Sequence, residues 1–357
     1  MSESLRLPPS DAIEASGDPS QPLQVDENVA ADEVDAEADA DSTYGSVSGS
    51  ARTGSIASSI YNYRYENGRR YHAYREGEYV LPNDDTEQER LDLQHHIWRL
   101  LLHGRLYTAP LSNPRRILDL GTGTGIWAID MADEFPSATV IGVDLSPIQP
   151  QWVPPNCTFY VDDYESDWTY RPHEAFDYIH GRALCGTASD WSKFYRRVYN
   201  NLNPGGYVEM QEYDAEFFAD DDSCDRARWS VTWTTQLDEA SKGFNKRINV
   251  AQFQKQWIID AGFVDVKEEV HRIPVGPWAK GPHLKELGKW ERIHMQMSVD
   301  SHTPALFSRI LGYTPDQVRV MMEQVKAEIR DKSLHLITSY RFVTGRRPTE
   351  GAVAHTS

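Results

Sequence analysis

The sequence predicts an α/β fold in which a mostly parallel sheet is covered by helices on both faces. From residue 115 onward, short apolar segments typical of strands alternate with segments of helical spacing. Most of these strands are apolar at nearly every position, as strands buried on both faces are. A glycine-rich turn, "GTGTG", joins the first strand of this region to its first helix. Together these features favour an alternating α/β architecture over an all-α or all-β one.

The N-terminal part of the chain has a different composition. Residues 1–60 contain twelve acidic residues and two arginines, so they carry −10 of the chain's net charge of −18. With few large apolar side chains, this part buries too little surface to offset the entropy cost of ordering. Residues 1–58 are therefore expected to form a disordered acidic tail, either a solubilising leader or a docking segment for a protein partner. Residues 349–357 are expected to be disordered as well.

A tyrosine-rich segment, residues 61–85, connects this tail to the first helix. It forms an arm that either lies over a ligand pocket or packs on the domain with half-buried tyrosines. The next segment has apolar residues on one side of a helix, and Thr86 with Glu89 forms the expected capping box at its start. The tyrosines of the arm are Tyr61, Tyr63, Tyr65, Tyr71, Tyr74 and Tyr79.

Beyond this N-terminal helical arm, strands and helices follow in a regular order. The core sheet is expected over about residues 115–217, with helices between its strands. One further strand is expected at about 263–276 and the last at about 334–345. The five core strands correspond to "RILDLG", "ATVIGVDL", "CTFYVDD", "AFDYIHG" and "YVEMQEY".

A helical insert is expected before the last strand, at about residues 280–331. Thr303-Pro304 and Thr314-Pro315 both look like helix starts, in which a threonine cap precedes a proline at the first helical position. The insert either adds to the core or forms a lid or wall of a ligand pocket. Trp278 and Trp290 are the residues there that suit stacking on a planar ligand.

The glycine-rich turn distinguishes between cofactors. Gly121, Gly123 and Gly125 give the spacing G-x-G-x-G, whereas a dinucleotide-binding turn has G-x-G-x-x-G, and Ile126 occupies the place of its last glycine. Asp119 ends the strand just before the turn, where its carboxylate repels a pyrophosphate and favours an ammonium group. S-adenosylmethionine has an α-amino group, a sulfonium and no phosphate. The turn therefore favours S-adenosylmethionine over NAD and argues against a dehydrogenase.

The motif "LDLGTGTG" resembles the first motif of the class I S-adenosylmethionine-dependent methyltransferases, D/E-x-G-x-G-x-G. Further landmarks fall in that family's order: Asp144 after the second strand, "VDD" after the third, "FDYIHGRAL" at the fourth and "LNPGGYVEMQE" before the fifth. The longer stretch "GTGTGIWAIDMADEFPSATVIGVDLSPIQPQWVPPNC" is similar to the fungal LaeA-like methyltransferases, named for a regulator of secondary metabolism. The resemblance implies a Rossmann-like sheet of seven strands within a methyltransferase domain at residues 59–348.

The resemblance also implies roles for the residues of these motifs. The three glycines let the backbone approach the cofactor, and Asp119 helps to hold its amino-acid part. Asp144 accepts hydrogen bonds from both ribose hydroxyls, for which a carboxylate with two free oxygens is suited. Either Asp162 or Asp163 binds the adenine amino group, and Asp162 is preferred because adjacent residues of an extended chain point opposite ways. For each acid the alternative is a place in a solvated loop or a helix cap.

Methyl transfer requires alignment of the acceptor and, for a weak nucleophile, removal of a proton. The ends of the fourth and fifth strands bring His180 and Glu212 toward the expected site. His180 is a candidate general base because the pKa of imidazole lies near neutrality, and Glu212 is a candidate for accepting a proton or orienting the acceptor. The alternative is that both are structural and that Arg182 pairs with a nearby acid. No metal site is expected.

The composition limits the partners of the chain. Outside the acidic tail the net charge is still −8, so no direct nucleic-acid binding is expected. No apolar run approaches the roughly 20 residues that cross a bilayer. Three well-separated cysteines suit a reducing compartment, so an intracellular location, cytoplasmic or nuclear, is expected.

Two functions remain open at this point. The first is transfer of a methyl group from S-adenosylmethionine to a small acceptor, which the LaeA-like resemblance suggests is a fungal secondary metabolite. The second is that of a LaeA-like nuclear regulator, which works through protein complexes and for which the acidic tail is a candidate docking segment. An enzyme needs an enclosed acceptor cavity beside the cofactor, whereas a regulator needs an exposed docking surface.

Overall fold

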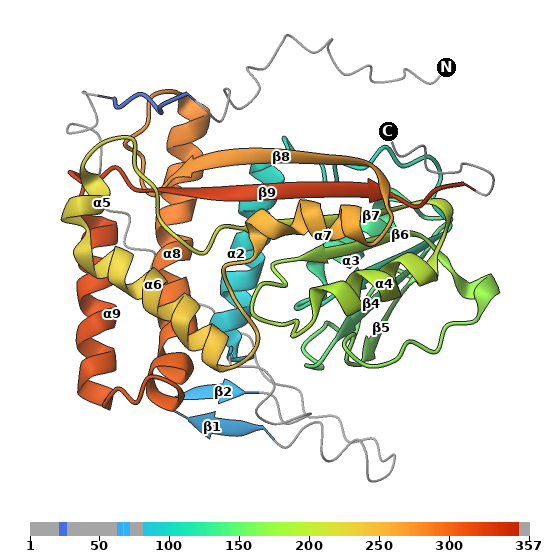
Figure 1. Ribbon diagram of the computed structural model, residues 1–357, viewed down its shortest axis with the longest axis horizontal. Coiled ribbons are helices and arrows are strands. Elements are labelled where there is room, and N and C mark those ends of the chain that lie inside the picture. The colour runs from blue at the N-terminus through green and yellow to red at the C-terminus, as the bar shows by residue number, and fades with distance from the viewer. Residues whose placement is uncertain (1–20, 27–62, 67, 72–80, 350–357) are drawn as a thin grey trace.

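Figure 1 shows the computed structural model, which describes residues 21–26, 63–66, 68–71 and 81–349. The disordered tail predicted over residues 1–58 lies outside the described residues except at 21–26. The C-terminal tail lies outside them from residue 350 onward. The predicted domain of residues 59–348 contains the whole sheet and the helices around it.

The main sheet of the described chain has seven strands: β3 (Arg116–Leu120), β4 (Thr139–Asp144), β5 (Cys157–Val161), β6 (Phe176–Arg182), β7 (Leu202–Tyr213), β8 (Val264–Pro274) and β9 (Ile337–Arg346). They lie in the order β5-β4-β3-β6-β7-β9-β8. Pairing is parallel from β5 to β7, whereas β9 is antiparallel to β7 and β8. The predicted seven-stranded Rossmann-like sheet is confirmed. Strand order reverses between β3 and β6, where open α/β sheets bind their ligands.

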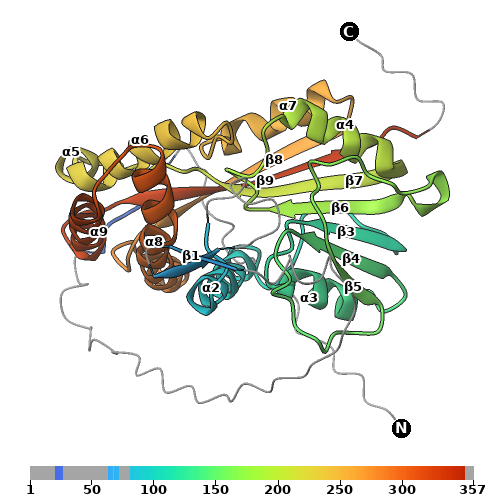
Figure 2. The same ribbon diagram turned by 90° about the horizontal axis from the view of Figure 1, so that it is seen from below.

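Helices cover both faces of this sheet (Figure 2). On one face, α3 (Ile126–Glu134) packs against β4 and β5, and α2 (Asp85–Leu101) packs against α3. On the other face, α4 (Trp191–Asn201) packs on β7 and α7 (Gln254–Asp260) on β8 and β9. This arrangement explains why β3 and β4 are buried along most of their length.

The predicted insert is confirmed as two helices, α8 (Pro282–Arg309) and α9 (Pro315–Arg330). They form a helical layer at one end of the sheet together with α5 (Ser223–Arg226) and α6 (Arg228–Gly243), which precede β8 (Figure 1). The layer is tied to the half of the fold that contains the glycine-rich turn because α8 also packs against α2.

The predicted helix start at Thr303-Pro304 is wrong, because Pro304 lies inside α8. A proline removes the hydrogen bond to the carbonyl four residues earlier, here that of Asp300. Arg69 donates to this freed oxygen at 2.9 Å, so the interior proline leaves no carbonyl unsatisfied there. By contrast, Thr314 caps α9 as predicted and forms a capping box with Gln317.

The helical arm begins slightly earlier than its sequence suggests. Asp84, and not Thr86, caps α2 by accepting a hydrogen bond from the backbone N–H of Glu87. The Asp84 carboxylate also binds Arg69 on a short hairpin of β1 (Arg64–Glu66) and β2 (Arg69–Tyr71). Tyr65 is exposed on this hairpin whereas Tyr71 is buried. The tyrosines at 61, 74 and 79 lie outside the described residues.

Residues 21–26 correct part of the disordered-tail prediction. Val25 forms a β-bridge with Ala279, and the backbone N–H of Asp26 donates to the carbonyl of Trp278 at 2.9 Å. Asp26 also forms an ion pair with Lys285 of α8, with 2.5 Å between nitrogen and oxygen. This segment is therefore fixed on the helical insert by both backbone and side-chain contacts.

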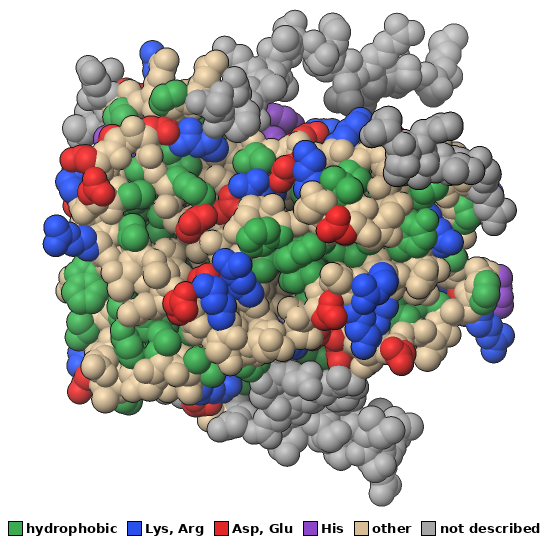
Figure 3. Space-filling model, viewed as in Figure 1, with side chains coloured by type: hydrophobic (Ala, Val, Ile, Leu, Met, Phe, Trp, Pro, Cys, Tyr) green, Lys and Arg blue, Asp and Glu red, His purple; other side chains and the backbone are tan. Residues whose placement is uncertain are grey.

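The surface of the domain carries both signs of charge. On the face seen in Figure 3, lysine and arginine side chains are interspersed with aspartate and glutamate, and apolar side chains lie between them. Among the described helices, none is both long and apolar enough to cross a membrane.

Candidate active site

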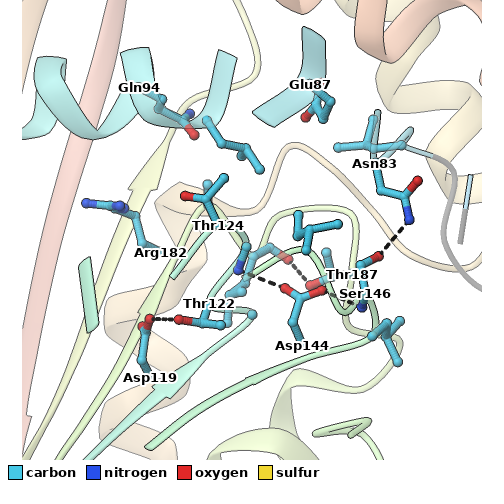
Figure 4. A pocket seen from close by; sticks show the side chains of 18 of the residues that line it. Asn83, Glu87, Gln94, Asp119, Thr122, Thr124, Asp144, Ser146, Arg182 and Thr187 are labelled. Atoms are coloured by element: carbon cyan, nitrogen blue, oxygen red, sulfur yellow. Dashed lines mark hydrogen bonds between the residues drawn. The ribbon is translucent and has the colours of Figure 1, made fainter. Parts of the chain in front are cut away.

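A cavity of about 120 Å³ opens at the carboxyl ends of the central strands. Its floor is the glycine-rich turn after β3, and its walls include the ends of β4, β6 and β7 together with α2. Figure 4 shows Asp119, Arg182 and Gln94 toward one side of this cavity and Asp144, Ser146 and Asn83 toward the other. The sequence motifs that are far apart in the chain thus meet in one place.

The turn itself requires glycine for reasons of backbone conformation and packing. Gly121 has a φ of +62° and Gly125 a φ of +81°, values that side chains rarely adopt. A Cβ atom on Gly121 would also lie 2.5 Å from a methyl carbon of Leu184, and one on Gly125 would overlap the ring of Phe159. The glycines were expected to make room for a cofactor. The structure shows that they are needed first for the turn and its own packing.

Asp119, at the end of β3, is buried and held in a fixed orientation. One carboxylate oxygen accepts a hydrogen bond from the hydroxyl of Thr122 at 2.5 Å. The other lies 2.7 Å from Nδ1 of His180. The His180 ring is fully buried and stacks on Trp127, with ring centroids 3.6 Å apart and planes within 6°. Asp119 is thereby positioned as an anionic group on one side of the cavity.

Asp144, at the end of β4, lines the opposite part of the cavity. Its two oxygens accept backbone hydrogen bonds from Gly123 at 2.9 Å and from Ser146 at 2.8 Å. Burial raises the pKa of this carboxyl to about 6, although the two N–H groups oppose the shift. Each carboxylate oxygen can accept more than one hydrogen bond, so both retain capacity for a ligand.

Of the two acids after β5, the structure brings only Asp163 to the cavity. Asp163 is 6% exposed, and its oxygens bind the backbone N–H of Glu165 and the hydroxyl of Ser166. Asp162 is exposed and lines a separate hollow beside Tyr170. The sequence favoured Asp162, whereas Asp163 is the acid on the cavity side; the backbone N–H of Asp162 donates to the carbonyl of Asp144 at 3.0 Å.

Glu212 lies away from the cavity that His180 lines. It is fully buried, and its oxygens accept hydrogen bonds from the backbone N–H groups of Leu184 at 2.8 Å and Cys185 at 3.3 Å. Burial raises its pKa to about 8. These contacts hold the segment after β6, which fits the alternative that Glu212 is structural.

Several residues of the cavity were not assigned from the sequence. Gln94 of α2 lines it, as does Arg182 at the end of β6. A guanidinium nitrogen of Arg182 lies 3.1 Å from Nδ1 of His95, and Nε2 of His95 lies 3.1 Å from Asp130 of α3. The one available signal was the position of Arg182 two residues after His180, which puts both on the same face of a strand.

Tyr213 lines both the main cavity and a second one of about 30 Å³. The Tyr213 hydroxyl lies 3.4 Å from Nε2 of His302 on α8, and Nδ1 of His302 is 2.9 Å from the carbonyl of Ser298. Burial lowers the pKa of His302 to about 4, so its ring is neutral with the proton on Nδ1. The hydroxyl of Tyr213 is thus the donor to His302. The apolar side chains around this second cavity are Phe217, Trp233, Leu237, Ile248 and Met295.

Comparison with known proteins gives consistent matches. Residues 93–268 match the family model described as a methyltransferase domain. The methyltransferase pytC of Aspergillus terreus is 39% identical over 297 residues, which cover 82% of this chain and 91% of that protein. The secondary metabolism regulator LAE1 of Cochliobolus heterostrophus is 37% identical, with coverage of 80% of this chain and 95% of that protein. The regulator laeA of Aspergillus flavus is also 37% identical, with coverage of 79% and 77%.

The matched domain runs from α2 into β8 and includes the glycine-rich turn and the acids of the cavity. These similarities agree with the strand order and with the position of the cavity at the switch point of the sheet. The chain belongs to the LaeA-like family of S-adenosylmethionine-dependent methyltransferases, which includes pytC and the laeA-type regulators.

Proposed function

We propose that the cavity binds S-adenosylmethionine with the amino-acid part beside Asp119 and the ribose beside Asp144, and that the enzyme methylates a small, largely apolar acceptor. The observation that carries this proposal is that two carboxylates, those of Asp119 and Asp144, line one cavity whose floor is the glycine-rich turn. Such a site suits a ligand with an ammonium group and hydroxyls, and it disfavours one with phosphates.

The residues of the cavity fit the parts of this cofactor in order. Asp119 is held by Thr122 and His180, so its carboxylate is ready to pair with an α-ammonium group. Asp144 offers both oxygens to vicinal hydroxyls while Gly123 and Ser146 keep it in place. Asp163 is the acid that we propose for the adenine amino group. We propose His180 as a positioning residue for Asp119.

When bound, S-adenosylmethionine supplies a methyl group already activated by the sulfonium. The work left to the protein is alignment of the acceptor and exclusion of water. Tyr213 is suited to this work because it lines the main cavity and its hydroxyl is oriented by His302. Burial raises the pKa of Tyr213 well above its usual range, so the group stays neutral.

A neutral hydroxyl beside an apolar second cavity favours an uncharged acceptor that carries an O–H or N–H group. With about 30 Å³, the second cavity has room for a small substituent of such a molecule. The similarity to the methyltransferase pytC and to regulators of secondary metabolism supports a small metabolite as the acceptor.

A regulatory function is the second candidate, because LAE1 and laeA are about as similar to this chain as pytC is. In that case the protein works in a nuclear complex, and the acidic N-terminal tail is the proposed contact with a partner. The two functions differ in turnover: an enzyme releases S-adenosylhomocysteine in the presence of its acceptor, whereas a regulator binds the cofactor without that release.

The first test is isothermal titration of the purified protein with S-adenosylmethionine, alongside Asp144→Ala and the control Asp162→Ala. A micromolar dissociation constant, about −8 kcal/mol, is expected for the wild type. Loss of two hydrogen bonds to a charged group predicts at least about tenfold weaker binding by Asp144→Ala, and Asp162→Ala is expected to bind as the wild type does. Absence of binding by the folded wild type would contradict the proposal.

A further inference from the structure

The second cavity is lined by two buried side chains whose polar atoms have no hydrogen-bond partner among the described residues. One is Thr338 on β9, with its hydroxyl, and the other is His294 on α8, with its Nδ1. Each of these residues is 1% exposed. A buried polar group without a partner is costly and is rare in folded proteins. Two such groups at one cavity of about 30 Å³ indicate a site for a polar ligand atom.

The contacts of His294 determine where the proton of its ring lies. A guanidinium nitrogen of Arg90 lies 2.9 Å from Nε2 of His294. Because arginine can only donate, Nε2 accepts this hydrogen bond and the proton of the ring is on Nδ1. A carboxylate oxygen of Glu291 lies 3.5 Å from Nδ1, without the geometry of a hydrogen bond. That oxygen accepts a hydrogen bond from the hydroxyl of Tyr340 at 2.9 Å. His294 therefore offers an unpaired N–H donor at the second cavity.

Thr338 differs from a second threonine of the same cavity, Thr234 on α6. The hydroxyl of Thr234 donates to the backbone carbonyls of Ser230 at 3.3 Å and Val231 at 3.1 Å, as is usual for a threonine inside a helix. On the strand β9, the hydroxyl of Thr338 has no such carbonyl to bond among the described residues. The unpaired hydroxyl is thus a property of position 338 and not of the whole cavity wall.

The second cavity adjoins the space in which an acceptor is proposed to bind. Tyr213 lines both the main and the second cavity. A third cavity of about 10 Å³ shares Cys185 and Lys246 with the main one, and Ile248 and His302 with the second. An acceptor bound beside the cofactor can therefore extend a small substituent into the second cavity.

We propose that Thr338 and His294 form a subsite for a neutral carbonyl oxygen of the methyl acceptor. This rests on the proposed function of the main cavity and names the acceptor class, an uncharged ketone, ester or amide. A carbonyl oxygen has two lone pairs and no proton, so it can accept a hydrogen bond from both donors, whereas a hydroxyl would bring a proton of its own. An anionic oxygen is disfavoured by Glu291 beside Nδ1 and by Glu216 on the cavity wall.

The test compares two phenols that differ in one group: para-hydroxyacetophenone has a carbonyl oxygen where para-isopropenylphenol has a methylene. Dissociation constants are measured by NMR titration, with S-adenosylhomocysteine at saturation, for the wild type, Thr338→Val, Thr338→Ser and the control Thr234→Val. Valine has nearly the shape of threonine without the hydroxyl, and serine keeps the hydroxyl. Thr234 is a matched control because it lines the same cavity with a hydroxyl that is already bonded.

The wild type should bind the ketone about tenfold more tightly than the isopropenyl compound, which leaves both donors unpaired. Thr338→Val should reduce this preference to about threefold or less, and Thr338→Ser and Thr234→Val should retain it. In the free protein, Thr338→Val should also raise the midpoint temperature of thermal unfolding by roughly 2 °C, because it removes an unpaired buried hydroxyl. Thr234→Val should give no such rise.

Three results overturn the subsite and leave the proposed function in place. The first is that the wild type binds S-adenosylhomocysteine but binds the two phenols equally or not at all. The second is equal weakening of both phenols by Thr338→Val, which would show that the residue only maintains the shape of the cavity. The third is a lower unfolding midpoint for Thr338→Val, which would show that the hydroxyl already has a partner. Failure of the wild type to bind S-adenosylhomocysteine would instead reject the proposed function, and the subsite with it.

Discussion

Glu212→Gln should change how the stability of the protein depends on pH. Glu212 is fully buried on β7, where it accepts hydrogen bonds from the backbone N–H groups of Leu184 and Cys185. Burial raises its pKa from the ordinary 4.5 to about 8. The carboxyl is therefore neutral in the folded protein at pH 7 and ionised in the unfolded chain.

The sign and size of the effect follow from this difference. A group with a raised pKa contributes stability that is complete below pH 4.5 and is lost as the pH rises toward 8. At 1.36 kcal/mol per pH unit, the whole loss is roughly 5 kcal/mol. Between pH 5.5 and 8.5, the wild type should lose about 3 kcal/mol relative to Glu212→Gln. The glutamine side chain stays neutral and keeps the hydrogen bond to Leu184.

Urea unfolding of the two proteins at pH 5.5, 7 and 8.5 measures this directly. The exposed Glu216→Gln, four residues further along, is the control for the substitution itself. A difference in the free energy of unfolding that does not vary with pH would contradict the assignment of a neutral buried carboxyl. A hundredfold fall in methyl transfer with unchanged cofactor affinity would restore the catalytic role that the sequence suggested.

Two further predictions concern the turn and the adenine end of the cavity. Gly125→Ala should lower the free energy of unfolding by about 2 kcal/mol, measured in urea, because a Cβ at a φ of +81° overlaps the ring of Phe159. A change below about 0.5 kcal/mol would show that the ring moves aside freely. Asp163→Asn should weaken S-adenosylmethionine binding about fivefold in a titration, and Asp162→Asn should not, since only Asp163 lines the cavity. The reverse order would reject our choice between the two acids.

Most of the fold was predictable because it depends on local pattern and on a family motif. The apolar runs gave the strands, and the landmarks after each strand gave their order as far as β7. The sequence-based prediction was wrong where a contact with a residue distant in sequence overrides the local pattern. Thr303-Pro304 has the pattern of a helix start, but Arg69 satisfies the carbonyl that the proline frees and allows α8 to continue.

The site was predictable where it lies next to the glycine-rich turn and less so elsewhere. Asp119 and Asp144 end adjacent parallel strands, so strand order alone brings them together. Gln94 comes from α2, which ends about twenty residues before the glycine-rich turn. Nothing in its local sequence marks it as part of the site. Its place depends on the packing of α2 against α3, which is a tertiary contact.

The pairing of strands also explains why His180 and Glu212 lie on opposite faces of the sheet. In the parallel pair of β6 and β7, His180 lies opposite Glu209. Side chains alternate between faces along a strand, so Glu212, three residues after Glu209, points to the face away from His180. The same alternation puts Tyr213 on the face of Glu209 and thus on the side of the cavity. A sequence that shows two polar residues at the ends of neighbouring strands cannot show their register, and here the register places Tyr213, and not Glu212, on the side of the cavity.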